Sequence, residues 1–162
     1  GAGSRFTVSL PWQGSQRHGR DPDLVRDGAG DSERAPKINK SQRLAHILLV
    51  EDNEVNIETT RDFLRAHGHK VTEARNGLEA IDRTKRERPD IILMDVQMPE
   101  MDGLEATRRI RADESVKNIP IIAMTALAMP GDRERCLNAG ATEYLSKPVK
   151  LSRLLELIQQ QL

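Results

Sequence analysis

Between residues 45 and 162, five short runs of mostly apolar residues alternate with five longer segments that have the residue spacing of helices. The runs are HILLV at 46–50, KVTEA at 70–74, DIILMD at 90–95, PIIAMTA at 120–126 and TEYLS at 142–146. Short apolar strands that alternate with helices predict a parallel sheet covered by helices on both faces. The alternation therefore predicts an α/β fold of the doubly wound kind for this region.

The segments between these runs carry start and stop signals for helices. Gly68 and Gly140 suit the C-terminal ends of two helices, Pro89 ends another, and Pro130 suits a first helical turn. In the first segment, positions 56, 60, 63 and 64 have helical spacing, and in the last segment so do the apolar residues 151, 154, 155, 158 and 162. The predicted helices cover residues 53–68, 76–88, 101–113, 130–140 and 150–162.

The first 44 residues differ in composition from the rest. In residues 1–12, Phe6, Val8 and Leu10 alternate with polar residues, which predicts one short strand that cannot be stable alone. Residues 13–44 are rich in Gly, Ser, Asp and Arg, and they have too few apolar side chains to offset the entropy lost on ordering. We therefore expect a flexible linker at 13–44 and a folded domain at 45–162.

The overall composition excludes several classes of protein. Lys and Arg total 25, and so do Asp and Glu, so no net charge favours nucleic acid or an anionic membrane as a partner. No run approaches the roughly 18 apolar residues of a membrane-spanning helix. The single cysteine, Cys136, excludes an internal disulfide and is typical of a reducing compartment, so we expect a cytoplasmic location.

Polar residues follow four of the five predicted strands. Glu51 and Asp52 follow the first strand, Asp95 ends the third, Thr125 lies in the fourth run, and Lys147 follows the fifth. The carboxyl ends of parallel strands share one edge of the sheet, and ligands bind there where the strand order reverses. If the order is 2-1-3-4-5, the three carboxylates converge at that point.

Three adjacent carboxylates require positive charge. Each like-charge pair at ~4 Å costs about 4 kcal/mol at an effective dielectric constant of ~20. The candidates are Lys147 and a divalent cation, and carboxylate oxygens in a partly open site favour Mg²⁺. A carboxylate beside a metal, a hydroxyl and an ammonium group has the parts for covalent phosphoryl transfer, with Asp95 as the nucleophile.

Four motifs carry a resemblance to a known family. LLVEDNEVN, IILMDVQMPEMDG, PIIAMTA and YLSKPV occur in order and at appropriate spacing, and with them residues 45–162 resemble the receiver domain of two-component signalling proteins. The resemblance implies a flavodoxin-like fold, with five parallel strands in the order 2-1-3-4-5 and five helices. It also implies that a phosphoryl group is accepted from a phosphohistidine on a partner protein.

The resemblance assigns roles to the residues of the site. Asp95 would be the phosphoacceptor, and Asp52 and Asp95 would bind Mg²⁺. Glu51 would act mainly through a metal-bound water, and the backbone carbonyl of Gln97 would be a further ligand.

The same resemblance assigns the residues that would respond to the phosphoryl group. Thr125 and Lys147 would contact the phosphoryl oxygens, and Tyr144 would move inward as the aromatic switch residue. It also implies a cis bond between Lys147 and Pro148.

The leading segment GAGSRFTVSLP resembles the last glycine box and final strand of the ATP-binding domain of histidine kinases. We therefore expect the carboxyl-terminal part of a hybrid histidine kinase that lacks the ATP site and is not followed by a DNA-binding domain. Its expected partners are a histidine-phosphotransfer protein and the phosphohistidine of the parent kinase, which could be membrane-anchored. The contact surface would be the 55–63 face of the first helix and the loop at Pro148.

Three alternative functions remain open at this point. One is a stand-alone response regulator with an unrelated tail. Another is a receiver that signals by binding alone, against which the complete set of site residues argues. A third is an Mg²⁺-dependent phosphohydrolase with an aspartyl nucleophile, which needs a second aspartate as general acid at the position of Gln97.

Overall fold

The computed structural model describes residues 43–126, 129 and 131–162, and within them the sheet has the predicted topology. All five strands are parallel, in the order β2-β1-β3-β4-β5, so the predicted flavodoxin-like fold class is confirmed. The predicted strand at 1–12 and the linker up to residue 42 lie outside the described residues. The strands are β1 (His46–Val50), β2 (Lys70–Ala74), β3 (Ile91–Asp95), β4 (Ile121–Thr125) and β5 (Glu143–Ser146).

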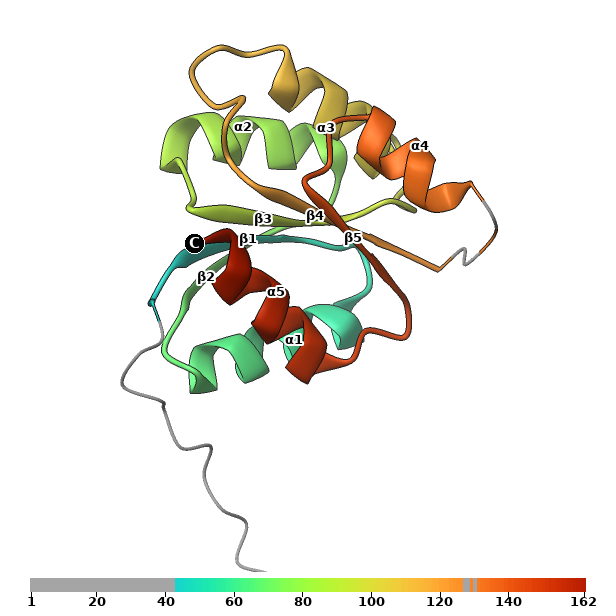
Figure 1. The fold of residues 1–162 in the computed structure, drawn as a ribbon. Helices are drawn as coiled ribbons and strands as arrows, with labels where there is room; N and C mark the ends of the chain where they lie inside the picture. The colour runs from blue at the N-terminus through green and yellow to red at the C-terminus, as the bar shows by residue number, and fades with distance from the viewer. Residues whose placement is uncertain (1–42, 127–128, 130) are drawn as a thin grey trace, which may run out of the picture. The chain divides into compact units, whose positions relative to one another are not determined.

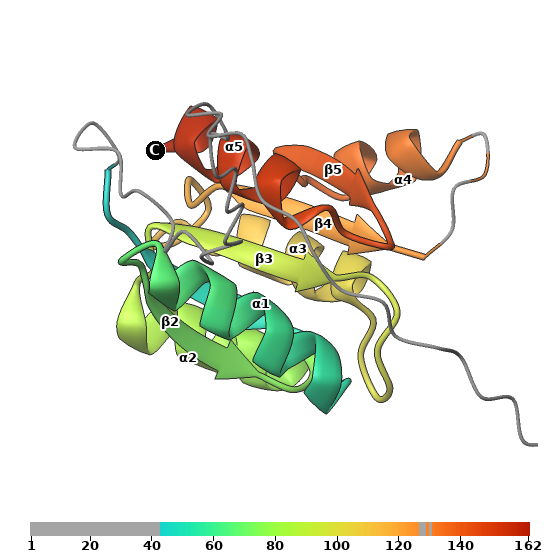
Figure 2. The same cartoon turned by 90° about the horizontal axis from the view of Figure 1, so that it is seen from below.

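Helices cover both faces of the sheet. Two helices, α1 and α5, lie on one face, and α2, α3 and α4 lie on the other (Figure 1, Figure 2). The described part of the chain contains no helix long and apolar enough to span a membrane. The helices are α1 (Glu54–Ala66), α2 (Gly77–Glu87), α3 (Gly103–Arg111), α4 (Asp132–Asn138) and α5 (Leu151–Gln161).

Alternate residues of the central strands face opposite layers of core. Along β1, Ile47 and Leu49 pack on the side of α1 and α5, whereas Leu48 and Val50 pack on the side of α2 and α3. Each of these four side chains is at most 1% exposed, and burying one contributes about 1.5–3 kcal/mol. The two layers hold the carboxyl ends of β1 and β3 at fixed positions, with Val50 paired to Met94.

In helix α1, not all positions with the predicted helical spacing are buried. Leu64 is fully buried, together with Ile57, while Asn56 is exposed. The Asn53 side chain caps the helix and accepts hydrogen bonds from the backbone N–H groups of Val55 and Asn56. Asn56 therefore lies in the first turn, beside the carboxyl edge of the sheet.

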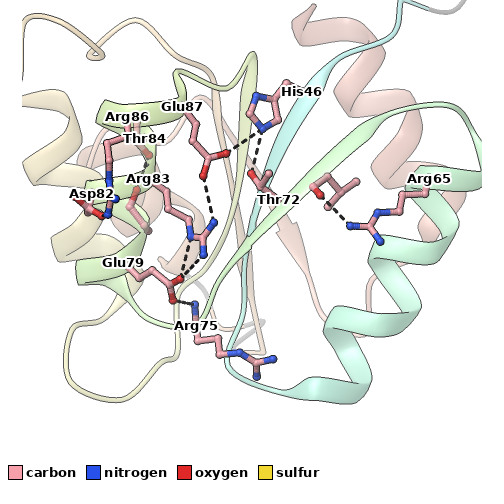
Figure 3. A network of polar contacts seen from close by, with 12 residues as sticks. His46, Arg65, Thr72, Arg75, Glu79, Asp82, Arg83, Thr84, Arg86 and Glu87 are labelled. Carbon is pink, nitrogen blue, oxygen red and sulfur yellow. Dashed lines mark hydrogen bonds and ion pairs between the residues drawn. The ribbon is translucent and has the colours of Figure 1, made fainter.

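A polar network links α2 to strands β1 and β2 (Figure 3). The His46 ring on β1 lies 3.1 Å from the Thr72 hydroxyl on β2 and 3.4 Å from a carboxylate oxygen of Glu87 on α2. Arg83 donates to Glu87 at 3.2 Å and to Glu79 at 2.9 Å, one helical turn away on either side. Each such helix pair contributes only a few tenths of a kcal/mol, so the network mainly sets the orientation of α2.

Buried His69 gives the first testable prediction. Its Nδ1 atom accepts a hydrogen bond from the Ala45 N–H at 3.2 Å, and its Nε2 atom has no partner among the described residues. Burial, and then the nearby His67, lower the pKa of His69 from 6.5. The unfolded chain therefore binds a proton as the pH falls through about 6.5 while the folded chain resists it, so stability is lost in that window.

We expect His69→Gln, which can still accept from Ala45, to weaken this pH dependence. Urea unfolding of both proteins between about pH 7.5 and pH 5 measures it. The free energy of unfolding of the wild type should fall more steeply with acid than that of the variant. Parallel curves for the two proteins would contradict the prediction.

Candidate functional site

Three carboxylates meet where β1 and β3 end. Glu51 and Asp52 directly follow β1, and Asp95 is the last residue of β3, which pairs with β1 in parallel. One oxygen from each of the three side chains lies within 4.8 Å of the other two. Glu51 and Asp95 are buried, at 3% and 2% exposure, whereas Asp52 is exposed. The convergence that the sequence predicted is present.

Lys147 bridges two of these carboxylates. Its Nζ atom donates to Oε2 of Glu51 and to Oδ2 of Asp95, each at 2.7 Å. The Lys147 backbone N–H donates to the Thr125 carbonyl at 2.7 Å, which extends the β4–β5 pairing to the base of this side chain. One ammonium group among three carboxylates still leaves two negative charges uncompensated within the cluster.

The buried environment shifts the pKa values of the bridged pair. Burial raises the pKa of Asp95, although hydrogen bonds from Lys147 and from the Gln97 N–H at 3.0 Å act in the opposite direction. For Lys147, burial lowers the pKa, but the hydrogen bonds to Asp95 and Glu51 outweigh it and the pKa is raised. Lys147 therefore remains protonated at neutral pH, and an ionised Asp95 is an anion that is poorly solvated by water.

Thr125 and Tyr144 lie on strands β4 and β5, across β3 from the β1 end that carries Glu51 and Asp52. Thr125 ends β4, is 2% exposed, and is one residue beyond Met124, the partner of Asp95 in the sheet. Tyr144 on β5 is half-buried against a cluster from α3 and α4 that includes Leu104. A cavity of about 200 Å³ separates α3 and α4 here, with Thr125 in its wall.

A small divalent cation fits this donor set. The three convergent side chains offer hard oxygen atoms, which Mg²⁺ prefers, and the cluster carries excess negative charge. Their ligand atoms come from two rigid strand ends, so little reorganisation is needed on binding. A role for the Gln97 carbonyl as a further ligand remains a prediction. The Lys147–Pro148 bond is cis, as the resemblance implied.

A groove leads from the site onto the surface of α1. It has a volume of about 540 Å³ and lies between α1 and the loop that joins β5 to α5. Glu51 and Lys147 are at its inner end, and the α1 side contributes three polar residues, Asn56, Thr59 and Thr60. Val55, in the first turn of α1, is 70% exposed. The surface that the sequence predicted for a partner is therefore accessible in the described residues.

Gly103 shapes the site, although the sequence predicted no role for it. Its N–H donates to the Val96 carbonyl at 3.0 Å, which brings the start of α3 against the end of β3. A Cβ atom added at Gly103 would collide with the backbone carbonyl of Asp95 and lie 2.9 Å from Cγ of Met94. Glycine is required here because two backbone segments touch. The signal was the glycine of the MDG sequence, in the first turn of the helix expected at 101–113.

Gly103→Ala should therefore destabilise the protein and displace Asp95. Overpacking typically costs 1–3 kcal/mol, and because the obstacle is backbone we expect about 3 kcal/mol, measured by urea unfolding. Backbone amide NMR shifts of Asp95 and Val96 should change. Gly77→Ala is the matched control for the NMR shifts, because its added methyl group also meets backbone, the Met101 carbonyl at 2.9 Å, but does not meet Asp95. Unchanged stability and unchanged Asp95 shifts in Gly103→Ala would contradict this account.

Comparisons with known proteins agree with this geometry. The family model described as "Response regulator receiver domain" matches residues 47–159. The polar-differentiation response regulator DivK of Brucella anthropi is 46% identical over 116 residues, which cover 72% of this chain and 94% of that protein.

Two solved structures extend the comparison. The receiver domain of a sensor histidine kinase from Pseudomonas aeruginosa has a magnesium ion coordinated in its active-site cleft; it is 46% identical, with a TM-score of 0.68 and coverage of 74% of this chain and 98% of its own. The receiver domain of the Saccharomyces cerevisiae response regulator Ssk1 was co-crystallised with the histidine phosphotransfer protein Ypd1. It is 32% identical, with a TM-score of 0.71, and the match covers 75% of this chain and 91% of that one.

Proposed function

Because this chain belongs to the response regulator receiver domain family, we propose that it accepts a phosphoryl group from a phosphohistidine onto Asp95. The family acts in two-component signalling. The observation that carries the proposal is the position of Asp95: a buried carboxylate, 2.7 Å from the Lys147 ammonium and within 4.8 Å of two further carboxylates.

The chemistry follows from which atoms of Asp95 are engaged. Oδ1 accepts from the Gln97 N–H and Oδ2 accepts from Lys147, which orients the carboxylate. A carboxylate has about four lone-pair positions, so both oxygens keep capacity for reaction. One oxygen attacks phosphorus in line, an acyl phosphate bond forms, and the phosphorus–nitrogen bond breaks with its electron pair passing to the imidazole.

Glu51, Asp52 and Asp95 would hold Mg²⁺, with the Gln97 carbonyl as an additional ligand. When bound, the ion would neutralise negative charge on the phosphoryl oxygens. Lys147 stays close to Asp95 and contributes a second positive charge on the same side. The Thr125 hydroxyl would hydrogen-bond a phosphoryl oxygen, and Tyr144 would follow the movement of Thr125 into the site.

The groove beside α1 supports a histidine-phosphotransfer protein as the partner. A docked partner must bring its imidazole to Asp95, and the groove at Asn56, Thr60 and Pro148 opens next to that residue's neighbours Glu51 and Lys147. The likeness to the Ssk1 receiver, co-crystallised with such a protein, supports the same assignment. The cytoplasm, where phosphohistidine proteins meet their receivers, is the proposed location.

The relatives favour a stand-alone response regulator over a hybrid histidine kinase. The match to DivK spans 94% of that response regulator. The hybrid kinase is the second candidate, because the Pseudomonas receiver that is 46% identical belongs to a sensor histidine kinase. Residues 1–12 as a kinase remnant remain a prediction. The full reading frame of the gene distinguishes the two candidates, since a kinase domain upstream of residue 1 identifies the hybrid.

Phosphoramidate tests the proposed function, because its phosphorus–nitrogen bond matches that of phosphohistidine. The full chain is incubated with phosphoramidate and Mg²⁺, and its intact mass is measured over time. We expect the gain of one phosphoryl group per chain. An unchanged mass after incubation with phosphoramidate and Mg²⁺ would contradict the proposal.

A further inference from the structure

Asn56 makes a direct contact with the acidic cluster. Its Nδ2 atom donates to Oε1 of Glu51 at 3.1 Å. Asn56 is exposed and belongs to the first turn of α1, so its side chain reaches from the wall of the groove down to a carboxylate that is 3% exposed. Asn56 is the last residue of the LLVEDNEVN motif, but the resemblance assigned no role to it.

Both oxygens of Glu51 are held by the protein. Oε1 accepts from Asn56 at 3.1 Å and lies 3.4 Å from the Asn53 backbone nitrogen, a long contact, while Oε2 accepts from Lys147 at 2.7 Å. Three of the roughly four lone-pair positions are therefore engaged. The remaining capacity of Glu51 suits one further donor, such as a water on the metal, in a direction that the protein fixes.

Without the Asn56 amide, Oε1 of Glu51 would keep only the 3.4 Å contact with the Asn53 backbone nitrogen. The carboxylate could then rotate about its terminal torsion, which is broad and has no strong preferred angle. Lys147 would hold a single oxygen and would not prevent that rotation. A donor on Oε1 is therefore what fixes the plane of the Glu51 carboxylate relative to Asp52 and Asp95.

We propose that Asn56 is a positioning residue of the metal site, which acts by fixing Glu51 in the orientation that a divalent cation requires. The inference rests on the proposed function, because it deepens the role of the same acidic cluster. Partners that orient metal ligands typically change metal affinity by 10- to 100-fold when removed. Since Lys147 still holds Glu51, we expect the lower end of that range for Asn56→Ala.

The experiment is a calorimetric Mg²⁺ titration of the full chain and three variants, without phosphodonor. Asn56→Ala should bind Mg²⁺ about ten-fold more weakly than the wild type. Asn56→Gln keeps an amide donor with a longer reach and should recover part of the affinity. Thr59→Ala is the matched control, because Thr59 lines the same groove and bonds the Val55 carbonyl at 2.8 Å, away from Glu51; its affinity should equal that of the wild type.

A second measurement needs no metal. The side-chain carboxylate carbon of Glu51 should change its NMR chemical shift in Asn56→Ala and keep it in Thr59→Ala. Equal Mg²⁺ affinity in the wild type and Asn56→Ala, or an unmoved Glu51 resonance, overturns the role of Asn56 alone. A wild type that binds no Mg²⁺ overturns the proposed metal site, and the Glu51 resonance then still decides whether Asn56 orients it.

Discussion

Asp95→Asn is expected to abolish phosphoryl acceptance. The amide has nearly the shape of the carboxylate and can still accept from the Gln97 N–H, but it lacks the charge and nucleophilicity that attack phosphorus needs. Removing the nucleophile from groups that act as a unit should lower the rate at least about a thousand-fold. Intact mass after incubation with phosphoramidate and Mg²⁺ measures the loss.

The stability of this variant separates lost chemistry from lost structure. Burial raises the pKa of Asp95, which means that its ionised form is costly in the folded protein. Neutralising it removes repulsion from Glu51 but also breaks the ion pair with Lys147, which keeps its bond to Glu51. In metal-free buffer these two effects oppose each other, so Asp95→Asn should stay folded and unfold at a urea concentration close to that of the wild type. A phosphorylated variant, or one that is unfolded at neutral pH, would contradict the assignment.

Lys147→Met should produce opposite changes in metal binding and phosphorylation. Methionine keeps much of the length of lysine but removes the ammonium group that lies 2.7 Å from both Glu51 and Asp95. The cluster then carries one more uncompensated negative charge, so Mg²⁺ should bind more tightly. Phosphoryl acceptance should be slower by about a hundred-fold, since a preorganised positive charge next to the phosphoryl oxygens is lost.

Lys147→Met should also destabilise the metal-free protein. Breaking a buried ion pair costs 3–5 kcal/mol, and because the Lys147 side chain is 20% exposed we expect about 2 kcal/mol. Lys150→Met, at an exposed position three residues along, is the matched control and should change neither stability nor metal affinity. Weaker Mg²⁺ binding in Lys147→Met would show that this lysine does not compensate the carboxylates.

The strand ends were the part of the site that sequence could predict. A parallel sheet brings the residues after its strands to one edge whatever the loops do, so Glu51, Asp52, Asp95 and Lys147 were placed together correctly. The fold class followed from the same alternation. The resemblance supplied the strand order, and the structure confirms it.

The close contacts between segments of the folded chain could not be predicted. The helical spacing of positions 56, 60, 63 and 64 predicted the helix, but it gave no sign that the Asn56 side chain contacts Glu51. The need for glycine at Gly103 depends on how tightly α3 returns onto β3, a tertiary distance that the glycine in the sequence does not reveal. Both features arise from segments that meet only in the folded chain.

Locating the phosphoryl group with and without Mg²⁺ tests the central claim most directly. The full chain is incubated with phosphoramidate, the acyl phosphate is reduced with borohydride, and the modified residue is identified by peptide mass spectrometry. We predict modification at Asp95 that depends on Mg²⁺ and disappears on chelation. Modification at another residue, or at Asp95 to the same extent without the metal, would contradict the account.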